Sequence, residues 1–335
     1  MKKVGIIGGS GYAGEELIRF LSFHDKTDLI AVSSRELAGS KVSELIEGSN
    51  LVFIDPDDEV FFDCEVIFFA TPHGISMKKA RHFLNKNIKI IDLSADFRIN
   101  DTNTWKHWYG IDHVDAEGLK DSVYGLTELN SEDIKKGNLI SVPGCYPTAS
   151  ILGLLPLIHK KAEIDTITID AKSGISGAGR STVKNKLSKE MKENFRAYAV
   201  EGHRHLPEIK HVLEDIYGGY LNINFLPHLI PAMRGIYATI YVNFTDSNTE
   251  SFKDFYKSFY EDSPNVKIME ESEIPETSKV NCSNTCQIGI YPSAIESQIV
   301  IISTIDNLIK GAAGQAIECY NLVCGYDQMQ GLING

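Results

Sequence analysis

Long apolar runs and an excess of positive charge are both missing from this sequence of 335 residues. No apolar segment approaches the ~20 residues that a helix needs to cross a bilayer. The first apolar run, Val4 to Ile7, breaks into glycines and is typical of a strand rather than of a signal peptide. The formal net charge is −12, whereas nucleic acids and membrane surfaces attract a basic face. We therefore expect a cytoplasmic protein with a small-molecule partner, and neither a nucleic-acid nor a membrane partner.

Disulfide frames and metal motifs are also missing. The six cysteines include no CxxC pair, so reduced thiols are the expectation. Cys282 and Cys286 have no second pair of ligands close by in the sequence, which disfavours a zinc site. We predict that the protein binds no metal.

The composition is that of a globular protein, with 43% hydrophobic and 23% charged residues. A chain of this length exceeds the usual size of one core, which favours two domains. Strands alternate with helices before Cys145, and this predicts an α/β fold with an N-terminal doubly wound, Rossmann-type parallel sheet. Longer strands follow Cys145 and indicate an α+β catalytic and dimerisation domain with a mixed or antiparallel sheet. The expected domains are 1–147 with 312–335, whose final helix (about Gly311–Val323) returns to the first domain, and 148–311.

A glycine-rich turn, Gly8 to Gly14, joins the first expected strand to the first expected helix. Glycines at that junction let the backbone approach a pyrophosphate at the helix N-terminus, so the turn predicts a dinucleotide site, although the spacing is GxxGxxG rather than GxGxxG. About twenty residues further on, Ser33-Ser34-Arg35 stands where an acidic residue would bind the ribose of NAD. Hydroxyl groups and a guanidinium suit the 2′-phosphate of NADP. Glu36 could instead bind the ribose of NAD, so NAD remains an alternative cofactor.

The segment from Pro143 to Ala149, PGCYPTA, places Cys145 between a strand and an apolar helix. Backbone amides and the helix dipole at such a position favour the thiolate, which is the nucleophilic form. The prolines and glycine around it describe an exposed elbow rather than the core position of an inert cysteine. We predict that Cys145 is a catalytic nucleophile.

A nucleophilic cysteine needs a proton-transfer partner, and His203-Arg204-His205 is the densest histidine cluster in the chain. Leu206-Pro207 follows directly and disfavours a helix through the pair, so we expect both imidazoles to face one pocket. Lone histidines such as His73 and His228 are more often structural. The cationic candidates for an anionic substrate are Arg98, Lys172, Arg180 and Arg234.

These segments together resemble the N-acetyl-γ-glutamyl-phosphate reductases, relatives of the aspartate-semialdehyde dehydrogenases and, more remotely, of the glyceraldehyde-3-phosphate dehydrogenases. The resemblance covers essentially the whole chain. One departure is Val142, where the family pattern has asparagine. The motifs are the glycine turn, DLSADFR at Asp92–Arg98, PGCYPTA, SGISGAGR at Ser173–Arg180, GHRHLPEI at Gly202–Ile209 and DNLIKGAAGQA at Asp306–Ala316.

The resemblance implies that NADPH reduces N-acetyl-γ-glutamyl phosphate to the semialdehyde, in arginine biosynthesis, through a thioacyl intermediate on Cys145. It assigns proton transfer to His203 by analogy, and it implies a homodimer or homotetramer. The substrate contacts that it implies are Ser94, Arg98 (bidentate to the phosphate), Arg180 and His205. The cofactor contacts are Gly8, Ser10, Gly11, Tyr12, Gly14, Ser33, Ser34, Arg35, Thr71, Ser176, Gly177, Asn307 and Gly311.

Several alternatives stay open at this point. Within the superfamily, the substrate could be a carrier-protein-bound aminoadipyl or glutamyl phosphate, or aspartyl phosphate. A non-catalytic nucleotide sensor would keep the glycine turn but would not need a thiolate at Cys145. A thiol hydrolase or transferase would use Cys145 with His203 and would not bind NADPH.

Overall fold

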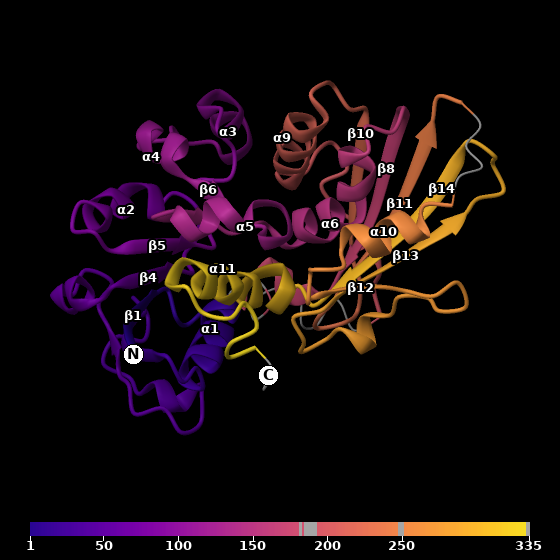
Figure 1. Cartoon of the computed structure of the whole chain (residues 1–335). Coiled ribbons are helices and arrows are strands. Elements are labelled where there is room, and N and C mark those ends of the chain that lie inside the picture. The colour runs from indigo at the N-terminus through magenta and orange to yellow at the C-terminus, as the bar shows by residue number, and fades with distance from the viewer. Residues whose placement is uncertain (181–182, 184–192, 247–250, 333–335) are drawn as a thin grey trace. The chain divides into compact units, whose positions relative to one another are not determined.

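The computed structural model of the chain describes residues 1–180, 183, 193–246 and 251–332. The chain divides into two compact units, one formed by Met1–Gly144 with Ala312–Gly335 and the other by Cys145–Gly311. Each unit contains one seven-stranded sheet (Figure 1). No helix in the described ranges is long and apolar enough to cross a membrane.

The sheet of the first unit is parallel throughout, with the order β3-β2-β1-β4-β5-β7-β6. The strand order reverses at β1, because β2 follows on one side of it and β4 on the other. Ligands of open α/β sheets bind at such a switch point, beyond the carboxyl ends of the strands. The predicted doubly wound sheet is confirmed. Its strands are β1 (Lys2–Ile7), β2 (Thr27–Ser33), β3 (Phe53–Ile54), β4 (Val66–Phe69), β5 (Lys89–Asp92), β6 (Val123–Tyr124) and β7 (Leu139–Ser141).

Helices lie on both sides of this sheet. α11 packs against α1 and α5, and α2 packs against α4; Figure 1 shows α1 and α11 on one side of β4 and β5, with α2 and α4 on the other. α11 starts three residues later than the predicted Gly311, because the chain first makes a π-helical turn, η6 (Ile309–Ala313). The helices are α1 (Tyr12–Ser22), α2 (Ser76–Leu84), α3 (Thr102–Tyr109), α4 (Ala116–Asp121), α5 (Thr127–Lys136) and α11 (Gly314–Cys324), with the 3-10 turns η1 (Val42–Glu44) and η2 (Glu59–Asp63).

The second unit contains a mixed sheet, as predicted, with the order β12-β13-β14-β11-β8-β10-β9. The pairs β8 with β10 and β12 with β13 are parallel, and the other pairs are antiparallel. The strands are β8 (Ile164–Ser173), β9 (Arg196–Ala197), β10 (Ile223–Leu229), β11 (Ile236–Phe244), β12 (Val266–Ile268), β13 (Cys286–Pro292) and β14 (Gln298–Ile305). The helices are α6 (Cys145–His159), α9 (His205–Tyr217) and α10 (Lys253–Phe259), with the 3-10 turns η3 (Ile175–Ala178) and η5 (Thr277–Lys279).

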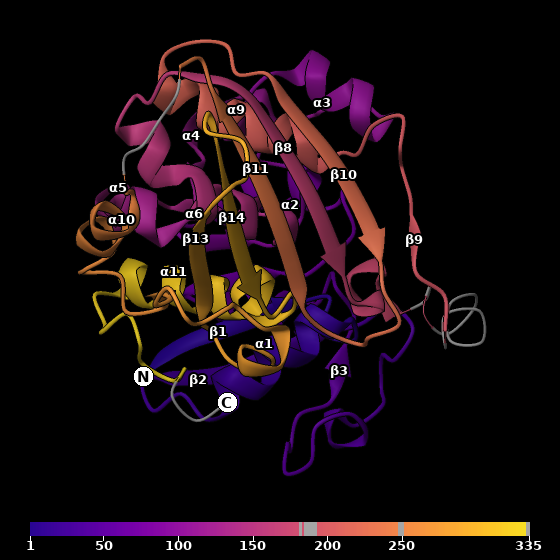
Figure 2. The ribbon, with the colours of Figure 1, turned by 90° about the vertical axis from the view of Figure 1, so that its right-hand side faces the viewer.

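Helix α6 is the core of the second unit, since every residue from Tyr146 to Ile158 is buried. A helix that is apolar all round must be covered on all sides, and α6 packs against β11, β13, β14, α9 and α10. Buried and half-buried residues alternate along β8 and β11. The buried face of the sheet therefore meets α6, and the half-buried face points the other way, toward the viewer in Figure 2.

The glycine turn gives a test of the fold. A Cβ at Gly14 would lie 2.5 Å from the Gly8 carbonyl oxygen and 2.7 Å from the Gly9 Cα, whereas a Cβ at Gly11 would have no atom within 4 Å. Gly14→Ala must displace backbone, and overpacking of that kind costs about 1–3 kcal/mol. We expect it to lower Tm by roughly 4–10 °C and Gly11→Ala to leave Tm nearly unchanged. Equal Tm values for the two variants, measured by scanning calorimetry, would contradict this packing.

Candidate active site

Cys145 is the first residue of α6 and is half-buried. Three residues separate it from the end of β7, so the carboxyl end of a parallel strand leads almost directly to a helix N-terminus. The positive end of the helix dipole favours negative charge on Sγ. The elbow predicted from PGCYPTA is therefore present, with the helix starting at the cysteine itself rather than at Ala149.

Gly311 lies against this cysteine. A Cβ at Gly311 would be 2.7 Å from the Cys145 Cβ and 3.2 Å from its Cα, so only glycine allows the approach without displacing the elbow. The resemblance assigns Gly311 to the cofactor. Within the second unit its observed neighbour is Cys145, the predicted nucleophile.

The imidazoles of His203 and His205 lie together, with ring centroids 4.8 Å apart. The expectation that no helix passes through the pair is wrong in part, because α9 begins at His205. Pro207 is tolerated because it lies in the first helical turn, where backbone N–H groups have no partner within the helix. The tight turn into α9 brings the two rings together.

Two features keep His203 neutral. Burial, with a further contribution from the Arg204 charge, lowers the pKa of His203 to about 4. The backbone N–H of His205 donates to Nδ1 of His203 at 3.1 Å. Because Nδ1 accepts this bond, we assign the imidazole hydrogen to Nε2. His203 is therefore arranged as a hydrogen-bond donor at neutral pH, not as a base.

Two tyrosines that the sequence did not single out complete this cluster. The ring of His203 contacts Tyr146 and Tyr198, with centroids 5.8 and 5.5 Å away. The Tyr198 hydroxyl donates to the Tyr146 hydroxyl at 3.3 Å, and Tyr146 donates to the His228 carbonyl at 3.1 Å. Burial raises the pKa of Tyr198 to about 12 and that of Tyr146 further, and the neighbouring Cys145 contributes to both increases. Tyr146 was visible as the residue after the cysteine; Tyr198 had no sequence signal.

The predicted residues Ser176, Gly177 and Asn307 also come together. Asn307 donates from Nδ2 to Ser176 Oγ at 2.9 Å and accepts from the Gly235 N–H at 2.8 Å. A Cβ at Gly177 would lie 3.8 Å from the Asn307 Nδ2. Ser176 and Asn307 are buried, so this cluster fixes the loop after β8 against the loop before β11.

The cationic candidates in the second unit have separate environments. Lys172 and His228 both contact Asp170, at 2.7 and 3.0 Å, on the half-buried face of the sheet opposite α6. Arg234 pairs with the buried Asp306 at 3.3 Å. Arg180 is half-buried at the end of the Ser173–Arg180 motif.

Arg98 and Ser94 are buried in the first unit. Arg98 donates from Nε to the Val142 carbonyl at 2.8 Å and from Nη2 to the Leu93 carbonyl at 2.7 Å. Ser94 donates from Oγ to Asp92 at 2.8 Å. These contacts are with the protein, and the substrate roles of both residues stay predictions.

The glycine turn has the geometry that a dinucleotide needs. Gly8 has φ of +96°, and a Cβ there would lie 2.6 Å from the Ala70 carbonyl oxygen, so the chain requires glycine. The N-cap of α1 is Gly11, which supplies no side-chain cap and leaves the helix N-terminus open on that side. Tyr12, the first residue of α1, is half-buried.

Hydroxyl groups surround this turn. Ser10 and Ser34 are joined through their Oγ atoms at 2.8 Å, and the Gly8 N–H donates to Ser33 Oγ at 3.4 Å. Arg35 is exposed just beyond them. The Thr71 Oγ1, in the loop after β4, is buried and has no hydrogen-bond partner in the described part of the chain. A ligand can supply the partner of such a hydroxyl, and together with the glycine turn and the open N-terminus of α1 it makes this end of the sheet fit a dinucleotide.

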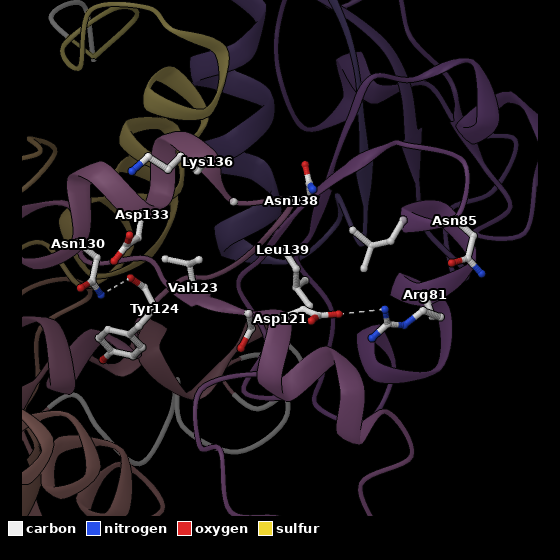
Figure 3. A pocket seen from close by; sticks show the side chains of 13 residues that line it. Arg81, Asn85, Asp121, Val123, Tyr124, Asn130, Asp133, Lys136, Asn138 and Leu139 are labelled. Carbon is white, nitrogen blue, oxygen red and sulfur yellow. Dashed lines mark hydrogen bonds and ion pairs between the residues drawn. The ribbon is translucent and has the colours of Figure 1, made fainter.

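A polar groove of about 710 Å³ lies elsewhere in the first unit, beside the edge strand β6 (Figure 3). Its lining includes Arg81, Asp121, Tyr124, Asn130 and Lys136, with an ion pair of 3.1 Å between Arg81 and Asp121. None of the predicted site residues lines it, so we assign it no function.

Comparison with known proteins decides the family. The profile of the semialdehyde dehydrogenase NAD binding domain matches residues 3–137, and that of the semialdehyde dehydrogenase dimerisation domain matches residues 145–307. The N-acetyl-gamma-glutamyl-phosphate reductase of Pseudomonas savastanoi pv. phaseolicola is 44% identical, over 99% of this chain and 98% of its own. That of Ruthia magnifica is 46% identical over the same shares.

The chain belongs to the N-acetyl-gamma-glutamyl-phosphate reductases, within the semialdehyde dehydrogenase family. Solved structures agree on the fold of these reductases. An aspartate semialdehyde dehydrogenase II from Vibrio cholerae matches with a TM-score of 0.76 at 16% identity, covering 97% of this chain and 98% of that one. An aspartate semialdehyde dehydrogenase from Candida albicans matches with a TM-score of 0.71 at 16% identity, covering 97% and 98%. The resemblance found in the sequence is confirmed.

The state of His203 in this reductase can be tested by kinetics. If the neutral Nε2–H of His203 donates to a reacting oxygen, His203→Ala should lower kcat by about 10²–10³-fold, because that donor is lost. The loss should be the same at every pH from about 5 to 9, because the pKa of about 4 places the titration of His203 below that range. His203→Asn, which keeps an N–H donor, should retain more activity. A loss confined to one limb of the pH profile would show proton transfer by His203 instead.

Proposed function

We propose that this chain reduces N-acetyl-γ-glutamyl phosphate to N-acetylglutamate 5-semialdehyde and phosphate, with NADPH, as a cytoplasmic enzyme of arginine biosynthesis. The substrate follows from the name shared by relatives that align with 99% of the chain. The reaction class is supported by one structural observation: Cys145 begins a buried helix, within one unit that also holds the His203 cluster. A sensor would not need that thiol.

Cys145 supplies the covalent step. Its thiolate attacks the acyl carbon of the acyl phosphate, a carbon–sulfur bond forms, the bond to the phosphate oxygen breaks, and inorganic phosphate leaves. NADPH, when bound, supplies the hydride that reduces the resulting thioester. The tetrahedral oxyanion then re-forms a carbonyl and expels the Cys145 thiolate, which the α6 N-terminus stabilises. The aldehyde departs and the thiolate is ready again.

The oxygen of the acyl group carries negative charge in both tetrahedral states. We assign the Nε2–H of His203 to that oxygen, because a fixed neutral donor stabilises charge where it develops. This replaces the proton-transfer role expected from sequence. His205, Ser94, Arg98 and Arg180 stay assigned to substrate binding, on the strength of the family motifs alone.

Each unit contains cofactor contacts that the family motifs imply. Gly8, Ser10, Gly11, Tyr12 and Gly14 would hold the pyrophosphate, with Thr71 donating its unpartnered hydroxyl. Ser33, Ser34 and Arg35 would hold the 2′-phosphate, which is the basis for NADP over NAD. Ser176, Gly177, Asn307 and Gly311 would line the nicotinamide end.

A second copy of the chain is the proposed partner. The half-buried face of the second sheet carries threonines and tyrosines such as Thr239 and Tyr241, and no described helix packs on it in this unit. A sheet with one uncovered face of this composition suits pairing between subunits. We propose a homodimer, which can associate further to a homotetramer.

The activity can be tested in the reverse direction. N-acetylglutamate semialdehyde should reduce NADP only when phosphate is present, and Cys145→Ser should lose essentially all turnover, at least about 10⁴-fold, because the covalent nucleophile is removed. Aspartate semialdehyde is the matched competitor and should be a poor substrate. Reduction of NADP without phosphate would exclude the acyl-phosphate reaction. A preference for aspartate semialdehyde as substrate would show that the chain acts as an aspartate-semialdehyde dehydrogenase.

The choice of cofactor rests on Arg35. Loss of a charged hydrogen bond to phosphate costs about 1.5–3 kcal/mol, so Arg35→Ala should raise KM for NADPH by roughly 10–100-fold and leave KM for NADH nearly unchanged. Glu36→Gln is the matched control at the neighbouring position. Equal changes for both cofactors in steady-state kinetics would place the 2′-phosphate elsewhere.

A further inference from the structure

Two aspartates at the carboxyl end of β5 are completely buried. Asp92 is the last residue of that strand, and Asp96 follows in the loop; neither is exposed to solvent. The hydroxyls of Ser76 and Ser94 lie between them and are buried as well. The four side chains form one hydrogen-bonded network.

The two carboxyl groups have different partners. Asp96 accepts from backbone N–H groups with both oxygens: from Gly74 at 2.6 Å on Oδ1 and from Met77 at 3.0 Å on Oδ2. Asp92 accepts one backbone bond, from the Ser94 N–H to Oδ1 at 2.9 Å. Its Oδ2 is 2.8 Å from both serine hydroxyls. An ionised carboxylate is stabilised by hydrogen-bond donors on both oxygens. Of the two aspartates, Asp96 has a backbone N–H donor on each oxygen, whereas Asp92 has one on Oδ1 only.

The hydrogens in the network can be counted. Four short contacts join Ser76 Oγ, Ser94 Oγ, Asp92 Oδ2 and Asp96 Oδ2: three at Ser76 and one between Ser94 and Asp92. The two serines provide two hydroxyl hydrogens. Three of the four contacts are shorter than 3.0 Å, and each of these needs a hydrogen between the two oxygens to be attractive, whereas the Ser76–Asp96 contact is 3.0 Å. A third hydrogen, on Asp92 Oδ2, is therefore favoured.

Arg98 and His113 lie beside this network. Arg98 donates to the carbonyls of Leu93 and Val142. His113 contacts the Asp96 carbonyl oxygen through Nε2 at 2.8 Å, and burial lowers the pKa of this imidazole, so it is neutral. If both buried carboxyl groups were ionised, each would lose its hydration and would also be repelled by the other charge. Both effects destabilise the doubly ionised state.

We propose that Asp92 Oδ2 holds a proton on the acid side of neutral pH while Asp96 acts only as an acceptor, and that this shared-proton network is a positioning device for the loop after β4 and for the segment that leads to Cys145. On one side Asp96 holds the loop after β4 through Gly74 and the first turn of α2 through Met77, and the loop contains Thr71. On the other side the Asp92 carbonyl accepts from the Val142 N–H at 2.8 Å. Arg98 ties Leu93 to the same Val142, three residues before Cys145.

The direction of the pH effect follows from the same arrangement. Burial, together with the neighbouring Asp96 carboxylate, raises the pKa of Asp92 above its ordinary value of 3.8. The folded protein then holds a proton that the unfolded chain releases. Its stabilising effect is complete below pH 3.8 and is lost as the pH rises from there through the raised pKa.

Paired amide variants test the assignment. Asp92→Asn keeps a hydrogen donor in place of the carboxyl O–H and should retain kcat and KM for NADPH within about threefold. Asp96→Asn turns an NH₂ group toward a backbone N–H, so it should lower kcat/KM by about 10–100-fold, with changes in both kcat and KM, because both loops shift. Asp63→Asn, at an exposed site in the same unit, is the control for loss of one negative charge. Equal damage from Asp92→Asn and Asp96→Asn, or none from either, would overturn the proposal.

Two further measurements keep the test decisive if a variant folds poorly. The Tm of Asp92→Asn relative to wild type should rise from pH 5 to pH 8, since only the wild type loses its proton there. Infrared difference spectra of the wild-type enzyme over the same range should show loss of a protonated carboxyl band. A constant Tm difference together with no such band would show that Asp92 is already ionised.

Discussion

The constraint on which the site depends is the junction between β7 and α6. A parallel strand must end at the carboxyl edge of its sheet, and here, after three intervening residues, the chain begins a helix that is buried on every side. Cys145 occupies the first position of that helix, where the helix dipole favours its thiolate. Because α6 cannot move without opening the core of its unit, the packing of this helix fixes the position of the predicted nucleophile.

Several residues around this junction stabilise it. Gly311 is a glycine because a Cβ would meet Cys145. Arg98 and the Asp92 carbonyl hold Val142 from the strand side. Tyr146, the second residue of α6, contacts the ring of His203 and so connects the helix start to the imidazole cluster. The chemistry proposed here uses one thiol and one neutral imidazole, and most of the surrounding residues serve to hold these two groups.

The sequence predicted those parts of the molecule that depend on local constraints. The glycine turn was visible because each close backbone approach requires a missing side chain, as at Gly14. The cysteine elbow was visible because proline and glycine restrict the backbone around it. The two sheets followed from the alternation of strands and helices. The family motifs also identified candidate site residues. The local sequence around those residues does not reveal their roles, so the roles stay proposals.

What the sequence did not show depends on contacts between distant segments. Tyr198 reaches Tyr146 across 52 residues, and nothing near Tyr198 marks it. The start of α9 at His205 does not follow from the sequence, because Pro207 disfavours a helix through the histidines, although the first turn of a helix accepts proline. The protonation of His203 depends on burial and on a backbone donor, which only the folded chain provides.

The central claim is that Cys145 carries the acyl group between two chemical steps. Rapid mixing of the enzyme with N-acetylglutamate semialdehyde and NADP in the absence of phosphate tests it most directly. We expect a burst of NADPH equal to the concentration of active sites, no further turnover until phosphate is added, and an acyl group on the peptide that contains Cys145. Continuous NADPH formation without phosphate, or a burst that survives in Cys145→Ser, would contradict the account.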